Sequence, residues 1–335
     1  MDRRPLLGLY ALAHFWVDLS CAFLVFRALA GRGDLALCLL LYNFCAFALQ
    51  MPLGLVADWL DRNGVVAALG CLVTAFSCFL PASPLLAVTA GVGNALFHLG
   101  GGIDTLRVSE KKAAALGIFV SPGALGLFVG TAWGKAASPG LWIAPALLAL
   151  FAAAILLLCR KTFGSLCSGN PPVDTAGDWR RLLPLFLVVV LRSWMGMNQS
   201  FSWKSAWPLA LTLALVLGKT AGGFAMDHLG PRRASALSLA AAALLYLFCD
   251  RPLPGIGAVF LFNMTMPVTL WAAARALPGA KGFSFGLLTF ALFLGYLPSF
   301  LGWPNPLATP WSYGLVALVS LLLLWWPLGK EAAEC

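Results

Sequence analysis

The chain alternates between long apolar runs and short polar breaks. About 20 consecutive apolar residues are enough to cross a bilayer as a helix. Because no backbone polar group can stay unpaired in lipid, such runs predict helices. The breaks are rich in Gly, Pro, Ser and Asp, as at 31–34 and 138–140. The pattern predicts twelve transmembrane helices over residues 5–29, 35–57, 64–82, 84–106, 113–133, 141–159, 182–201, 206–226, 234–249, 254–275, 282–302 and 311–328.

The composition excludes a water-soluble protein. Hydrophobic residues make up 61% of the 335 residues and charged residues 10%, whereas soluble domains carry about 25% charged residues. The first apolar run, 5–29, is too long for a typical signal peptide and is interrupted by His14 and Asp18. It therefore predicts a transmembrane helix. The fold class is all-α, a polytopic membrane protein.

Two further absences narrow the function. The chain has no Gly-x-x-x-x-Gly-Lys-Ser/Thr phosphate-binding loop, which argues against an ATP-driven pump. Its nine cysteines form no Cys-x-x-Cys pair and no Cys/His ligand spacing. We therefore expect no cofactor and no metal site.

The loop charges predict the orientation of the helices. Of the 22 Lys and Arg residues, fifteen lie in loops on one side of the predicted membrane and five on the other. Because basic loops stay in the cytoplasm, both termini are expected there, in a plasma (inner) membrane protein. The same clustering accounts for the net charge of +9 without a nucleic-acid partner. The fifteen are Arg3, Arg4, Arg62, Arg107, Lys111, Lys112, Arg160, Lys161, Arg180, Arg181, Arg232, Arg233, Arg275, Lys281 and Lys330.

An internal repeat divides the chain. Polar and aromatic residues recur without a gap at an offset of 169 positions, in equivalent predicted helices. Parallel repeats of six helices are a transporter design in which substrate binds between the halves near the midplane. We predict an N-terminal bundle over 1–159, a cytoplasmic linker over 160–181 and a C-terminal bundle over 182–335. The matching pairs are Gly54 and Gly223, Asp58 and Asp227, Asn94 and Asn263, Lys112 and Lys281, Gly117 and Gly286, Gly126 and Gly295, and Trp142 and Trp311.

Two loops one repeat apart share a motif. Each carries Gly-x-x-x-Asp followed by basic residues, after the second and the eighth predicted helix. An Asp at a helix C-terminus is unfavourable unless a neighbouring helix N-terminus or a basic group compensates it. The motif resembles the G-x-x-x-D-x-x-G-x-R-R signature of the major facilitator superfamily; the second copy is complete, whereas Asp61 replaces the second glycine of the first. The resemblance implies a gating role for Gly54, Asp58, Arg62, Gly223, Asp227, Gly230, Arg232 and Arg233.

Helices 1, 4 and 5 resemble one branch of that superfamily, the fosmidomycin-resistance transporters. That branch has a His…Asp pair in helix 1, matched by His14 and Asp18, and Phe-His-Pro-Glu-Gly in helix 4. Here Phe-His stands at 97–98, and Leu-Gly at 99–100 replaces Pro-Glu. Residues 117–126 are similar to the Gly/Pro-rich antiporter motif, which favours efflux.

Six polar residues fall near the predicted midplane. Ionisable residues in a membrane are costly and usually face a cavity or a partner. Residues four apart share one helix face, as His14 and Asp18 do. The superfamily resemblance implies that helices 1, 4, 7 and 10 line the central cavity, whereas plain helix-packing hydrogen bonds are the alternative for each residue. The substrate- and proton-binding candidates are His14, Asp18, Asn94, His98, Arg192 and Asn263.

Together these features predict a secondary transporter that works by alternating access. The expected activity is proton-coupled export of a small organic solute or drug by a monomer in the lipid bilayer. A proton-coupled importer or a facilitator on the same fold is the alternative. A polytopic enzyme, such as an acyltransferase using His98 or His14, would need neither the repeat nor the doubled motif.

Overall fold

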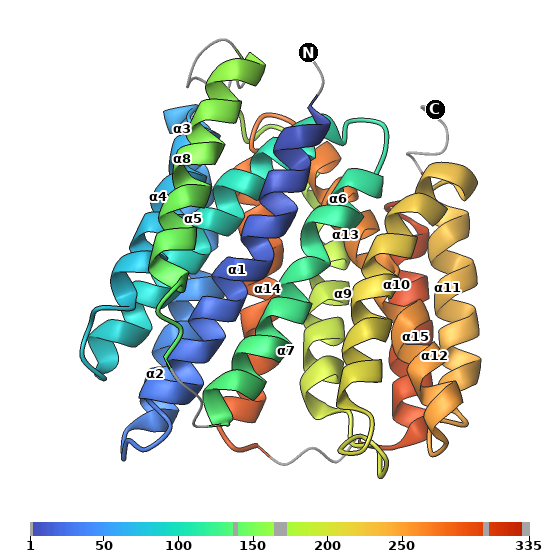
Figure 1. Ribbon diagram of the computed structural model, residues 1–335. Coiled ribbons are helices and arrows are strands. Elements are labelled where there is room, and N and C mark those ends of the chain that lie inside the picture. The colour runs from blue at the N-terminus through green and yellow to red at the C-terminus, as the bar shows by residue number, and fades with distance from the viewer. Residues whose placement is uncertain (1–2, 137–139, 164–172, 304–307, 330–335) are drawn as a thin grey trace. The chain divides into compact units, whose positions relative to one another are not determined.

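The computed structural model describes residues 3–136, 140–163, 173–303 and 308–329. All regular structure in these residues is helical (Figure 1). The helices are α1 (Arg4–Ala28), α2 (Leu35–Asn43), the π-helical segment η1 (Phe44–Ala48), α3 (Gln50–Leu60), α4 (Asn63–Ser77), α5 (Pro84–Val108), α6 (Ala114–Val120), α7 (Pro122–Lys135), α8 (Ala144–Phe163), α9 (Trp179–Asn198), α10 (Pro208–Leu229), α11 (Pro231–Tyr246), α12 (Pro252–Asn263), α13 (Thr265–Ala276), α14 (Lys281–Phe300) and α15 (Pro310–Trp325).

Nine helical stretches in the described part of the chain are long and apolar enough to cross a membrane. Three of them, Leu35–Leu60, Ala114–Lys135 and Pro252–Ala276, consist of consecutive helices with a short irregularity between them. The helices α4, α11 and α15 have 15, 16 and 16 residues, fewer than the roughly 20 that span a bilayer. The prediction of an all-helical, multi-span chain is confirmed, and twelve crossings stay a prediction.

Proline sets the start of many helices. A proline at the first helical position has a suitable φ and lacks only an N–H that would have no helical partner. The length of an apolar run does not show where its proline will start the helix. Several predicted helix starts therefore differ from the observed starts by two or three residues. In the predicted helix 113–133, Pro122 starts a new helix directly after Ser121. The helices that begin with proline are α5, α7, α10, α11, α12 and α15.

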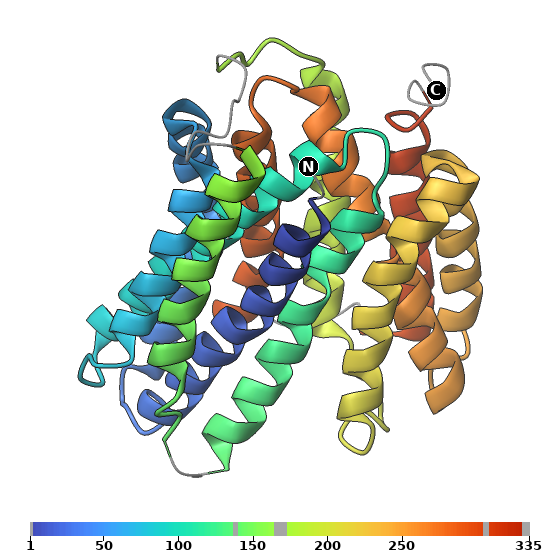
Figure 2. The same ribbon diagram turned by 45° about the horizontal axis from the view of Figure 1, so that its top comes forward.

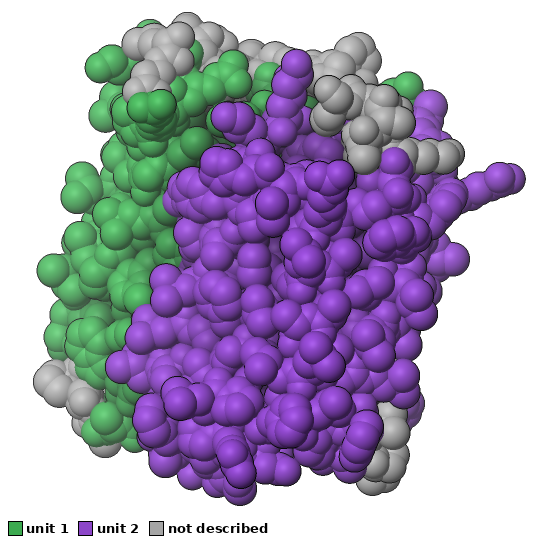
Figure 3. All heavy atoms as spheres, turned by 90° about the vertical axis from the view of Figure 1, so that its right-hand side faces the viewer, with its two compact units in different colours: residues 1–108, 122–175, 279–290 green, residues 109–121, 176–278, 291–335 purple. Residues whose placement is uncertain are grey.

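The chain folds into two compact units, each built from segments far apart in the sequence (Figure 3). Unit 1 comprises 1–108, 122–175 and 279–290, and unit 2 comprises 109–121, 176–278 and 291–335. Thus α6 belongs to unit 2, whereas α7, which follows it directly, belongs to unit 1. The division into bundles at 160–181 stays a prediction, and 164–172 of that linker lie outside the described residues.

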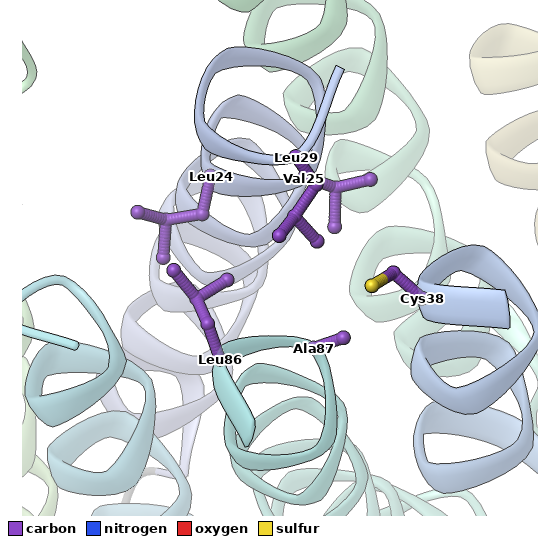
Figure 4. Packing of buried hydrophobic residues seen from close by; sticks show 6 residues of the cluster. All are labelled: Leu24, Val25, Leu29, Cys38, Leu86 and Ala87. Atoms are coloured by element: carbon purple, nitrogen blue, oxygen red, sulfur yellow. The ribbon is translucent and has the colours of Figure 1, made fainter. Parts of the chain in front are cut away.

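The core of unit 1 holds α1 between α5 and α7. Figures 1 and 2 show α1 and α7 side by side. They approach closely because glycines recur every four residues along α7 and form a buried stripe that faces α1 backbone. Cβ atoms at Gly126 and Gly130 would collide with the carbonyls of Phe15 and Leu19. At one end of α1, an apolar cluster joins it to α2 and α5 (Figure 4). Its buried members are Leu24, Val25, Leu29, Cys38, Leu86 and Ala87.

We expect Gly130→Ala to destabilise the protein by about 1–3 kcal/mol, the usual range for overpacking a tight interface. Gly8→Ala is the matched control, because Gly8 lies in α1 with open space where its Cβ would be. There alanine should stabilise the helix by roughly 0.5–1 kcal/mol. Thermal unfolding of the purified variants compares the two. Equal effects of the same sign would contradict close packing of α7 on α1.

Candidate functional site

Four of the predicted site residues meet in unit 1 and form what we call the polar cluster. His14 and Asp18 come from α1, and Asn94 and His98 come from α5. The Asn94 side chain donates from Nδ2 to Asp18 Oδ1 at 2.7 Å. His14 Nε2 lies 3.2 Å from Asp18 Oδ2 and 2.8 Å from His98 Nε2. His98 Nε2 is also 3.8 Å from the other Asp18 oxygen.

The backbone determines which ring nitrogen of His98 carries a proton. His98 Nδ1 lies 2.8 Å from the carbonyl oxygen of Asn94, one helical turn earlier. A carbonyl oxygen can only accept, so Nδ1 is the donor and Nε2 of a neutral His98 presents a lone pair. The proton between the two imidazoles then belongs to His14 Nε2, which also faces the Asp18 carboxylate. The cluster thus holds one carboxylate and two imidazoles in a network that can exchange protons.

The polar cluster is largely shielded from solvent. His14 is buried, and the side chains of His98 and Asp18 keep 13% and 18% exposure. Gly123 on α7 closes one side, since a Cβ there would collide with His14 Nε2 and Asp18 Oδ2. A side chain at this position would require His14 or Asp18 to shift. Because Asp18 keeps some exposure, protein atoms do not cover its carboxylate completely.

The polar cluster also has the composition of a cation site. One ligand atom each of His14, Asp18 and His98 lies within 4.8 Å of the others. The sequence predicts no metal site, because its Cys and His residues show no ligand spacing along the chain. Here the two histidines are 84 positions apart, and the packing of α5 on α1 brings them together.

Arg192 lies in unit 2 and is buried, with 7% of its surface exposed. From α9 it donates through Nη1 to Thr265 Oγ1 and through Nη2 to Thr269 Oγ1, each at 3.3 Å. Each hydroxyl donates in turn to the carbonyl three residues earlier in the chain, at 3.0 Å for Thr265 and 2.9 Å for Thr269. These two hydrogen bonds of the guanidinium therefore end on neutral acceptors. The partners described for Asp18 come from unit 1.

Asn263 ends α12, directly before the short break that precedes α13. Its Nδ2 donates to the carbonyl of Val259 in the same helix at 2.8 Å. This hydrogen bond lies within one helix and is not a helix-packing bond. A role in substrate binding stays a prediction.

The aspartates of the two motif loops have equivalent partners. Asp58 in α3 accepts from the backbone N–H groups of Gly282 and Phe283 at 2.8 and 2.9 Å, where α14 begins. Asp227 in α10 accepts from the backbone N–H groups of residues 113–114 at 2.6 and 3.2 Å, where α6 begins. Each carboxylate thus binds the N-terminus of a helix distant in the sequence. This is the electrostatic compensation that the sequence requires of them.

The glycines of the motif have separate physical reasons. A Cβ at Gly54 would collide with the backbone of Gly282, and one at Gly223 with the backbone at 113–114. The first glycine of each copy therefore lets the partner helix approach its aspartate. The position of the motif's second glycine has a positive φ in both copies, +80° at Gly230 and +49° at Asp61. Aspartate tolerates this conformation better than most residues.

The basic residues of the motif lie at the surface. Arg62 and Arg233 are exposed. Arg232 donates from Nε and Nη2 to the backbone carbonyl of Trp325 at 3.1 and 3.0 Å. Its guanidinium also lies over the indole ring of Trp325, 4.8 Å from the ring centre. The described contacts of Arg232 therefore tie α11 to α15.

Sequence reasoning missed three residues that complete these sites. Thr265 and Thr269 are four positions apart in an apolar helix, and this spacing is the one signal of a shared polar face. Gly123 lies inside the stretch that resembles the antiporter motif, yet nothing in the sequence links it to His14 and Asp18. Such links depend on how α1, α5 and α7 pack.

Comparison with known proteins shows a likeness in fold alone. No protein-family model and no curated protein matches the chain. Among solved structures, the human organic anion transporter MFSD10 (TETRAN) is similar with a TM-score of 0.69 and 16% sequence identity, over 97% of this chain and 100% of that one. Two structures of FucP are similar with TM-scores of 0.66, over 96% of this chain and 98% of theirs. One is the E. coli fucose:proton symporter, at 11% identity, and the other is FucP in the outward conformation, at 10%. The chain therefore has the fold of major facilitator superfamily transporters.

Proposed function

We propose that this protein is a secondary active transporter that exports a small organic solute or drug in exchange for protons. The observation that carries the proposal is the largely shielded polar cluster, whose carboxylate and imidazoles can bind protons, within a fold shared with major facilitator superfamily transporters. The proposal includes twelve crossings in two six-helix halves, both termini in the cytoplasm, and a monomer in the plasma membrane. It also includes alternating access as the mechanism.

Proton coupling is supported by the chemistry of the polar cluster. Asp18 accepts one hydrogen bond from Asn94 and lies beside two imidazoles, so a proton can move among three groups without leaving the helix pair. Histidine titrates near neutrality when unperturbed, which suits a proton carrier at physiological pH.

Gating is supported by the two motif aspartates. Each holds the N-terminus of a helix through two hydrogen bonds to a carboxylate, and hydrogen bonds to a charged group are worth about 1.5–3 kcal/mol each. If these bonds break in the opposite conformation, they favour the one described. Asp58 in unit 1 and Asp227 in unit 2 then act as latches.

The substrate candidate with the best support carries an anionic group. Arg192 is buried, and the two hydrogen bonds described for it go to neutral hydroxyls, so a carboxylate or a similar group would compensate its charge. MFSD10, with a similar fold, is an organic anion transporter. FucP is a fucose:proton symporter, which keeps proton-coupled import as the alternative on this fold.

The proposal is tested by flux into proteoliposomes. Compounds that raise the melting temperature of the purified chain are first selected, because a ligand of the folded state stabilises it by mass action. Their accumulation is then measured with a pH gradient imposed in either direction. Export coupled to protons predicts accumulation when the lumen is the more acidic side. Accumulation with the opposite gradient indicates symport, equal flux under both gradients indicates a facilitator, and chemical conversion without flux indicates an enzyme.

Arg192→Ala is expected to reduce substrate binding roughly 30-fold or more, because removing one partner of a buried charged contact costs about 2–5 kcal/mol. Transport should fall in both gradient-driven and exchange assays. Arg192→Lys keeps the charge but loses the planar fork that reaches Thr265 and Thr269 together, so its effect should be smaller. Arg251→Ala, at an exposed position, is the control. Unchanged binding in Arg192→Ala would remove Arg192 from the substrate site.

A further inference from the structure

Three potential ligand atoms of the polar cluster converge on one point. His14 Nε2 is 2.8 Å from His98 Nε2 and 3.2 Å from Asp18 Oδ2. The ligand atoms of all three residues lie within 4.8 Å of one another. We propose that His14, Asp18 and His98 bind one divalent transition-metal ion of the zinc class.

The distances fit a single ion after small side-chain movements. Zinc lies about 2.0–2.1 Å from histidine nitrogens, so two such nitrogens are about 2.9 Å apart at a right angle and about 3.3 Å apart at a tetrahedral angle. The two separations from His14 Nε2, 2.8 and 3.2 Å, are close to this range. The contact between His98 Nε2 and Asp18 Oδ1 is wider, at 3.8 Å. Slight spreading of the two imidazoles therefore opens a position bounded by two nitrogens and one oxygen.

The groups behind the ligands are already arranged for metal binding. Histidine ligands usually donate their second ring N–H to a carbonyl or carboxylate, which orients the ring and directs its lone pair to the ion. His98 Nδ1 does this to the Asn94 carbonyl at 2.8 Å. The Asn94 side chain also holds Asp18 Oδ1 at 2.7 Å, which leaves Oδ2 on the side of His14. Asn94 therefore orients two of the three ligands.

The donor set selects the class of ion. Two imidazoles and one carboxylate suit zinc, cobalt, nickel or iron, whereas calcium and magnesium prefer oxygen ligands alone. The side chains of His98 and Asp18 are 13% and 18% exposed, so protein atoms do not fully cover the proposed ligands. The proposal concerns binding and does not rest on the proposed transport.

Gly123 provides a variant that blocks the position without removing a ligand. A Cβ at this residue would collide with His14 Nε2 and Asp18 Oδ2, the atoms that bound the proposed ion position. Gly123→Ala should therefore weaken metal binding while all three ligands remain. Gly8→Ala, where a Cβ meets nothing within 4 Å, is its control.

The test is titration of the purified full-length chain in detergent with Co²⁺, whose visible absorption reports its ligands. Wild type should bind one ion without the near-ultraviolet charge-transfer band of a thiolate. His14→Gln, His98→Gln and Gly123→Ala should each bind at least about tenfold more weakly. Asn94→Ala should weaken binding by roughly 10- to 100-fold, the usual effect of losing a group that orients metal ligands. His228→Gln removes the third histidine of the chain and should bind like wild type.

X-ray absorption of the zinc-loaded wild type tests the site without any variant. Nitrogen and oxygen neighbours at about 2.0–2.2 Å, with the signature of two imidazoles, are expected. Sulfur neighbours at about 2.3 Å would overturn the proposal, because they would place the ion on cysteines. Failure of wild type to bind Co²⁺ would also overturn it. So would equal binding by folded His14→Gln and His98→Gln proteins, or loss of binding in His228→Gln alone.

Discussion

Asp18→Asn is expected to reduce substrate accumulation driven by a pH gradient to the level of protein-free liposomes. Exchange of labelled for unlabelled substrate at equal concentrations should continue. Asparagine has nearly the shape of aspartate and can still accept the hydrogen bond from Asn94, but it cannot take up and release a proton. Exchange needs no net proton movement, so it survives the loss of the carboxylate. Both assays are run on one preparation with a metal chelator present, so that protons alone occupy the polar cluster.

Asp34→Asn is the control for this prediction. Asp34 lies in the loop between α1 and α2, where it is paired with Arg32 at 2.6 Å, and this pairing lowers the pKa of its carboxyl. The Asp34→Asn variant should transport like wild type, because Arg32 and Asp34 lie past the end of α1, whereas Asp18 lies within that helix. Gradient-driven accumulation by Asp18→Asn at the wild-type rate would contradict the role of Asp18. His98 would then be the next candidate for the proton carrier.

Asp227→Asn is expected to slow net transport about tenfold or more while substrate affinity stays within about twofold. The carboxylate accepts from both N–H groups at the start of α6, and an amide has only one oxygen for this purpose. Losing one charge-assisted hydrogen bond, at about 1.5–3 kcal/mol, changes the ratio of two conformations by roughly 10- to 150-fold. Asp227→Asn leaves the proposed substrate-binding residues unchanged, so the affinity of each conformation for substrate should stay the same.

The matched comparison for the latch uses three aspartates. Asp58→Asn should act in the same direction as Asp227→Asn but less strongly, because the first motif copy is incomplete. Asp250→Asn, at an exposed position beyond α11, should leave transport unchanged. Transport rates and equilibrium binding are measured on each protein. Wild-type rates in both motif variants would show that these hydrogen bonds do not govern the conformational change.

The sequence predicts well those features that lipid and local charge determine. Every predicted span overlaps a helix in the structure, because an apolar run has no other way to satisfy its backbone in a membrane. The need of Asp58 and Asp227 for a helix N-terminus or a basic group also follows from local electrostatics. Which helix each one binds does not, because α14 and α6 come from distant parts of the chain.

The chemistry of the site depends on packing that a single sequence does not reveal. The spacing of His14 and Asp18 predicts one shared face, but only the register of α5 against α1 brings His98 to 2.8 Å from His14. The contact of Gly123 with the same atoms needs the break before α7 and the glycine stripe that seats α7 on α1. Side chains suited to bind a metal ion therefore come together although their spacing in the sequence does not predict a metal site.

Proton movement caused by substrate alone tests the central claim most directly. Wild-type proteoliposomes with equal pH inside and outside, a chelator present and a pH-sensitive dye in the lumen receive external substrate. Exchange of substrate for protons predicts that the lumen becomes more alkaline as labelled substrate enters, with a signal that an uncoupler abolishes. Substrate entry without any change in luminal pH, or with acidification of the lumen, would contradict proton-coupled export.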